Sequence, residues 1–115
     1  MTTPPDENLE RALRALRIEY LAESPDRVSE LWRALARVQN GDRDGLEALH
    51  LRAHRLAGSG GGYGVPDVSA AARDADQYVR RLSESSSLPA SADIDRLGEL
   101  VQGIADAFTK ARAPE

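Results

Sequence analysis

The residue best suited to chemistry is His54, which lies four residues after His50 and four residues before Gly58. These three residues share one side of a helix, because positions four apart are neighbours on a helical surface. His54 projects about 130° from the centre of the apolar stripe on the same segment, so we expect its imidazole to face solvent or a partner. A neutral imidazole carries a free lone pair and is a competent nucleophile towards an activated phosphoryl group.

Gly58 and Leu51 indicate that this side of the helix is a docking surface. Gly58 lies one turn after His54, about 6 Å along the axis, where a larger side chain would crowd the approach to the ring. A glycine inside a helix costs about 1 kcal/mol relative to alanine, which favours a use for the open space. Leu51 adds an apolar group beside the histidine, on a face that the core does not need. We therefore predict that another protein docks here.

Other chemistries fit these residues poorly. The chain has no cysteine, and its two histidines could hold a metal ion only with help from carboxylates. The segment from His50 to His54 has the spacing of a zinc-binding HExxH motif but lacks the glutamate, so we predict no metal site. The run from Gly58 to Gly64 matches a dinucleotide-binding GxGxxG only loosely, because that fingerprint follows a strand and opens a helix. Here the glycines close a helix, and we expect Tyr63 to fill the end of the core.

Length and composition predict a single domain spanning residues 1–115. Hydrophobic residues make up 41% of the chain and charged residues 30%, which are ordinary globular values. The apolar residues are mostly Leu, Ala and Val, which favours an all-α protein with closely packed helices. The formal net charge of −4 disfavours nucleic-acid binding. No stretch has the pattern of a signal peptide or a membrane span, so we expect a cytoplasmic protein with no membrane contact.

Apolar residues recur every three or four positions in five segments, which predicts helices packed into an antiparallel bundle. The segments begin at Asp6 or Glu7, at Ser24, near residue 42, at Val65 and at Ser91, and residues 1–6 and 113–115 are expected to be flexible tails. Ser24 and Ser91 are predicted to be helix N-caps. The residues expected to face the core are Leu9, Leu13, Leu16 and Tyr20; Val28, Leu31, Leu35 and Val38; Leu46, Leu49, Ala53 and Leu56; Val68, Ala72, Ala75, Val79 and Leu82; and Ile94, Leu97, Val101, Ile104 and Phe108.

The segment Ala53-His54-Arg55-Leu56-Ala57-Gly58-Ser59, followed by Tyr63-Gly64 and a helix that opens at Val65-Pro66, resembles the signature of histidine-containing phosphotransfer (HPt) domains. That signature is roughly H-x-L-K-G-S/A, followed within a few residues by an apolar residue and glycine. The segment from Tyr20 to Val28 is similar to a second characteristic stretch of the family. The resemblance covers about residues 10–82 and agrees in the order of the elements as well as in the residues.

The resemblance implies an up-down-up-down four-helix bundle with an extra N-terminal helical segment. It implies that His54 accepts a phosphoryl group on Nε2 from the aspartate of a response-regulator receiver, or from a histidine kinase, and passes it on. The receiver would supply magnesium and the catalytic acids, so the chain would be a carrier without a cofactor of its own, and not an enzyme. Gly58 matches the small residue that leaves room for the phosphoryl group, and Ser59 matches the position after it.

One position departs from the family pattern. Ala57 stands where the family usually has a lysine that helps to neutralise the phosphoryl charge. Arg55 is the neighbouring cation that could substitute, since a guanidinium can contact phosphate oxygens in a bidentate manner, whereas Arg52 lies nearer the buried side. For docking we predict an apolar patch of Leu51, Ile18 and Leu21 beside His50, with Ile18 and Leu21 outside the core-facing stripe. We expect a monomer.

Three alternatives stay open on the sequence. The chain could be an HPt-like docking protein that binds a receiver or another partner without being phosphorylated. It could also be a helical-bundle interaction protein in which His54 is merely exposed. A kinase dimerisation domain is less favoured, because the acid-then-proline pattern of such domains does not follow His54.

Overall fold

The computed structural model describes residues 5–113, with side chains from residue 6 onwards. In this range the chain forms five helices and no strand: α1 (Pro5–Ala22), α2 (Ser24–Gln39), α3 (Asp44–Gly62), α4 (Pro66–Ser83) and α5 (Ser91–Arg112). The all-helical prediction is confirmed for these residues. Of the tails predicted at 1–6 and 113–115, residues 1–4 and 114–115 lie outside the described range, whereas Pro5 and Asp6 are helical. None of the described helices is long and apolar enough to span a bilayer.

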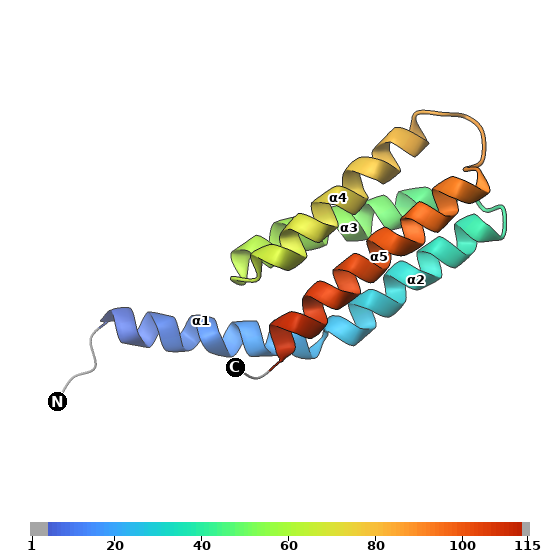
Figure 1. Cartoon of the computed structure of the whole chain (residues 1–115). Coiled ribbons are helices and arrows are strands. Elements are labelled where there is room, and N and C mark those ends of the chain that lie inside the picture. Colours follow the sequence, from blue (N-terminus) through green and yellow to red (C-terminus); the bar gives the residue numbers. More distant parts are fainter. Residues whose placement is uncertain (1–4, 114–115) are drawn as a thin grey trace.

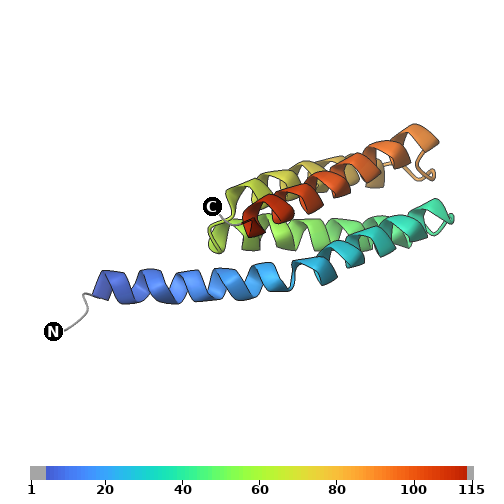
Figure 2. The ribbon, with the colours of Figure 1, turned by 60° about the horizontal axis from the view of Figure 1, so that its bottom comes forward.

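Helices α2 to α5 form a bundle in which each helix packs against two others: α2 against α3, α3 against α4, α4 against α5, and α5 against α2. Figure 1 shows the chain running back and forth through these four helices, and it reverses at residues 40–43, 63–65 and 84–90. α1 lies outside the bundle. Only its last turns touch α2 and α5, and the rest projects beyond the bundle end (Figures 1 and 2).

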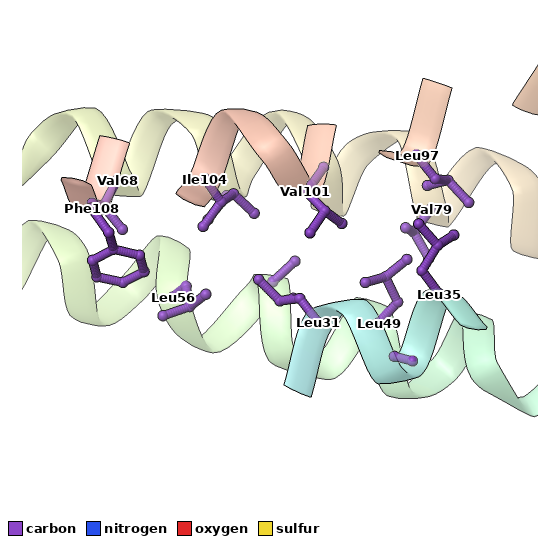
Figure 3. Packing of buried hydrophobic residues seen from close by; sticks show 14 of the residues in the cluster. Leu31, Leu35, Leu49, Leu56, Val68, Val79, Leu97, Val101, Ile104 and Phe108 are labelled. Atoms are coloured by element: carbon purple, nitrogen blue, oxygen red, sulfur yellow. The ribbon is translucent and has the colours of Figure 1, made fainter. Parts of the chain in front are cut away.

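The core is built from one apolar stripe on each of the four bundle helices, and Figure 3 shows these side chains pointing towards one another. The stripes predicted for α2 to α5 are confirmed, with their central residues almost fully buried: Leu31, Leu35 and Val38; Leu46, Leu49, Ala53 and Leu56; Val68, Ala72, Ala75 and Val79; and Leu97, Val101, Ile104 and Phe108. Three residues at the stripe ends, Val28, Leu82 and Ile94, are partly buried.

Small residues let α3 and α4 approach closely. Gly60 is buried, and a Cβ added there would lie 2.9 Å from the backbone nitrogen of Ser69 and 3.2 Å from its Cα. The Ser69 hydroxyl donates a hydrogen bond to the carbonyl of Ala57, which joins the two helices at the same level. This close contact fixes which residues of α4 face the histidines of α3.

The core face predicted for α1 is wrong over most of its length. Leu9, Leu13 and Leu16 are 59%, 50% and 46% exposed, and only Tyr20 of that stripe is buried. The apolar spacing identified the stripe correctly, but the helix runs past the bundle end and nothing in the described chain covers the stripe there (Figure 2). Leu21, predicted to be exposed, is buried at 8% exposure, because the last turn of α1 presses against the bundle.

Two further predictions at helix ends are wrong. Ser24 does not cap α2, because Glu23 keeps helical backbone angles and α2 follows α1 almost without a break. Its buried hydroxyl instead donates to the carbonyl of Leu21 and accepts a hydrogen bond from Arg112, each at 2.6 Å. Ser91 is the first residue inside α5 rather than its cap.

Tyr63 is not the core residue that the sequence predicted. It is 39% exposed, and its ring stacks on the buried ring of Tyr20 with centroids 4.4 Å apart. It therefore covers the bundle end from outside.

The packing of α3 on α4 predicts opposite effects for two glycines of the same helix. Gly60→Ala should lower the free energy of unfolding by about 1–3 kcal/mol, because the added methyl group would overlap the Ser69 backbone. Gly58→Ala is the matched control, since a Cβ there meets nothing within 4 Å, and it should raise the free energy of unfolding by up to about 1 kcal/mol. Urea unfolding followed by circular dichroism measures both. Equal effects would contradict this account of the packing.

Candidate functional site

His54 lies on the outer face of α3, and its side chain is 60% exposed. The predicted exposure is confirmed. Its Nδ1 atom lies 3.2 Å from Oδ2 of Asp76 on α4, within hydrogen-bond distance. More than half of the side-chain surface is therefore open to solvent.

Asp76 is the residue around which the site is arranged. Its side chain is only 8% exposed, and it lies between α3 and α4. Oδ1 lies 2.5 Å from Nδ1 of His50, although neither atom has a hydrogen-bond partner of good geometry within the described residues. Oδ2 lies 3.7 Å from Nε of Arg80, one turn along α4. One buried carboxylate thus faces two imidazoles and a guanidinium.

This arrangement selects the tautomer of His54. A carboxylate only accepts hydrogen bonds, so Nδ1 of His54 must carry the proton that it donates to Asp76. The lone pair of a neutral ring is then on Nε2, which points away from Asp76. The geometry therefore favours Nε2 as the nucleophilic nitrogen. No group of three metal-ligating side chains occurs among the described residues.

Sequence reasoning missed Asp76, because it lies 22 positions after His54 and meets it only through the packing of α3 on α4. A signal was present. Asp76 directly follows Ala75 on the apolar side of its helix, and a carboxylate beside a core stripe requires a partner.

The structure places the other predicted site residues, Gly58, Arg55 and Ser59, differently with respect to His54. Gly58 lies in open space one turn after His54, as predicted. Arg55 is exposed, but it lines a small groove with Arg27 and Glu30 on the flank that faces α2. The Ser59 hydroxyl is 2.8 Å from the hydroxyl of Tyr20, so it joins α3 to α1 instead of lying beside the histidine ring.

The predicted apolar docking patch is not assembled. Leu51 is exposed on the His54 side of α3, but Leu21 is buried and cannot contribute. Ile18 is exposed and lines a different groove, with Val65 at the start of α4 and Lys110 near the end of α5. The prediction of a patch shared by Leu51, Ile18 and Leu21 is wrong, because α1 buries Leu21 and brings Ile18 to a groove beside Val65.

Two arginines of α4, Arg73 and Arg80, lie on the side of that helix that carries Asp76. Ser69 packs against Gly60, and Asp76 meets His54, so Arg73, between Ser69 and Asp76, lies alongside α3 close to the level of His54. Residues three apart share a helix face, which places Arg73 on the same side of α4 as Asp76. Arg73 is exposed, and Arg80 lies on the other side of Asp76. Neither residue was singled out by the sequence analysis.

The family model described as Hpt domain matches residues 15–109, which is most of the chain. The searches of curated proteins and of solved structures gave no match.

Proposed function

The chain belongs to the Hpt domain family, whose members take part in phosphorelay signalling, and we propose that His54 is the residue that carries the phosphoryl group. The observation that supports this most directly is the exposed imidazole whose Nδ1 is held by a buried carboxylate, with Gly58 leaving space beside the ring. We propose response-regulator receivers and histidine kinases as partners, acting in the cytoplasm.

In the proposed forward step, the Nε2 lone pair of His54 attacks the phosphorus of an aspartyl phosphate on the receiver. A nitrogen–phosphorus bond forms, the phosphorus–oxygen bond breaks, and the receiver carboxylate leaves with the electron pair. The return step reverses these changes. Asp76 accepts the Nδ1 hydrogen bond throughout and stabilises the positive charge that develops on the ring. The chain is a carrier in this scheme, and the receiver supplies magnesium and acid–base groups.

We propose that Arg73 and Arg80 take over the role of the missing lysine at Ala57. Both lie on the side of α4 that carries Asp76, and Arg80 approaches the carboxylate oxygen that also faces His54. A guanidinium retains its charge at any physiological pH and contacts phosphate oxygens in a bidentate manner. Arg55 is the poorer candidate, because it lies on the flank towards α2.

The alternative is a docking protein that binds a receiver but accepts no phosphoryl group. Ala57 is the observation that favours it, because the usual cation is absent from α3 itself. The two functions predict the same binding partner and differ only in covalent labelling.

Labelling with a phosphorylated receiver tests His54 directly. Wild-type protein and His50→Gln should take up an acid-labile phosphoryl group, and His54→Gln should take up none, because only His54 combines exposure with a solvent-facing Nε2. Label in His54→Gln that is lost in His50→Gln would overturn the assignment. Receiver binding by wild-type protein without label would favour the docking alternative.

Asp76 is proposed as a positioning residue, and Asp76→Asn tests this. We expect transfer to slow by about 10–100-fold, because the amide can present either a donor or an acceptor to Nδ1 and no longer selects one tautomer. Nitrogen NMR shifts should change from a single Nε2-unprotonated tautomer of His54 to a mixture. Asp74→Asn, an exposed neighbour, is the control and should change neither quantity. A lower rate with an unchanged tautomer would mean that Asp76 matters only for the fold.

The origin of the compensating charge is tested by three alanine variants. Arg73→Ala and Arg80→Ala should each slow transfer about 5–30-fold, the effect of losing one charged hydrogen bond of about 1–2 kcal/mol, whereas Arg55→Ala should leave the rate unchanged. Single-turnover transfer from a phosphorylated receiver measures each rate at saturating receiver, which separates the chemical step from docking. A reduced transfer rate in Arg55→Ala, with unchanged rates in both α4 variants, would instead assign the neutralisation of the phosphoryl charge to Arg55 on α3.

A further inference from the structure

The first part of α1 carries an apolar stripe that the rest of the described chain leaves uncovered. Leu9, Leu13 and Leu16 are each about half exposed, and they continue the line of Tyr20, which enters the core. Figures 1 and 2 show that this part of the helix projects past the end of the bundle. Tyr63, stacked on Tyr20 and itself partly exposed, extends the same stripe at the bundle end.

A single helix that projects from its bundle has little stability of its own. Isolated helices of fewer than about 12–15 residues are marginal in water, and most helical stability in proteins comes from packing an apolar face. Leu9, Leu13, Leu16 and Tyr20 follow one another at intervals of 4, 3 and 4 residues, which is the seam of a two-stranded coiled coil. The spacing therefore favours another helix as the covering element.

The charges along this seam identify that helix as a second copy of α1. Glu10 and Arg17 lie seven residues apart, hence on the same flank of the stripe, and they have opposite signs. If two copies pair antiparallel about a twofold axis between Leu13 and Leu16, each Leu13 meets Leu16 of the other copy. Each Glu10 then lies beside Arg17 of the other copy, and the pair occurs twice. A parallel pairing places Ala12 beside Arg17 and brings no opposite charges together.

We infer that the chain forms a symmetric dimer through antiparallel pairing of its α1 helices. The interface is isologous, so each copy covers the stripe of the other and neither is left with an exposed seam. The first turns of one α1 reach towards the bundle end of the other copy, where Tyr63 is exposed. The inferred dimer differs from the monomer that we expected from the sequence. The inference is independent of phosphoryl transfer.

Charge exchange tests the pairing and its direction together. Analytical ultracentrifugation of the full chain, up to about 1 mM, should show a species of twice the 12.5 kDa chain mass that dissociates on dilution. Glu10→Arg and Arg17→Glu should each weaken dimerisation about tenfold, because each replaces two attractive pairs by two repulsive ones. An equimolar mixture of the two variants should dimerise about as well as wild type, since both pairs between the two different chains then again join opposite charges.

The controls make the same charge changes on the opposite face of α1. Glu7→Arg and Arg11→Glu lie away from the seam and should leave the dimer unchanged to within about twofold. Leu13→Glu should abolish the dimer while circular dichroism shows that the bundle remains folded. A wild-type chain that stays monomeric up to about 1 mM overturns the inference. So does a dimer that survives Leu13→Glu, or a mixture of the charge variants that does not associate.

Discussion

The close approach of α3 and α4 is the constraint on which the rest of the site depends. It exists because Gly60 has no side chain where Ser69 arrives, and because alanines fill much of the contact on both helices. A larger residue at this level would separate the helices and move Asp76 away from His54. The hydrogen bond that orients the His54 ring therefore depends on packing that lies about two turns away from it, and the apolar core and the orientation of the ring share one structural cause.

Burial of Asp76 explains how this site fixes the orientation of a histidine ring that lies on an exposed surface. A buried carboxylate is unfavourable unless charged or hydrogen-bonding groups face it, and here His50, His54 and Arg80 do so. The exposed ring is thus held by an interaction that water competes with only weakly. His50, which the sequence suggested as part of a docking surface, lies beside the same carboxylate, with its ring centroid 5.8 Å from that of His54.

The sequence predicted those features that depend on one helix at a time. The apolar stripes of α2 to α5, the exposure of His54 and the open space at Gly58 all follow from the helical repeat. Features that depend on how two helices pack against each other could not be predicted from the sequence. Periodicity showed that Leu9, Leu13 and Leu16 form a stripe, but not that α1 passes the end of the bundle. Asp76 and Ile18 were missed or misplaced for the same reason, because the angle at which helices meet is set by side-chain packing across the whole core.

The departure at Ala57 can be understood from the same packing. Ala57 lies half-buried against α4, and its carbonyl accepts the hydrogen bond of Ser69, so this position takes part in the contact between the two helices. A long charged side chain there would have to leave that contact towards solvent. On the proposed function, a small residue at 57 lets α4 come close enough for its own arginines to lie beside the phosphoryl site. The positive charge beside the phosphoryl group then comes from the arginines of α4 instead of from a residue of α3. A phosphohistidine site in this arrangement would respond to changes in α4 more strongly than to changes beside the histidine itself.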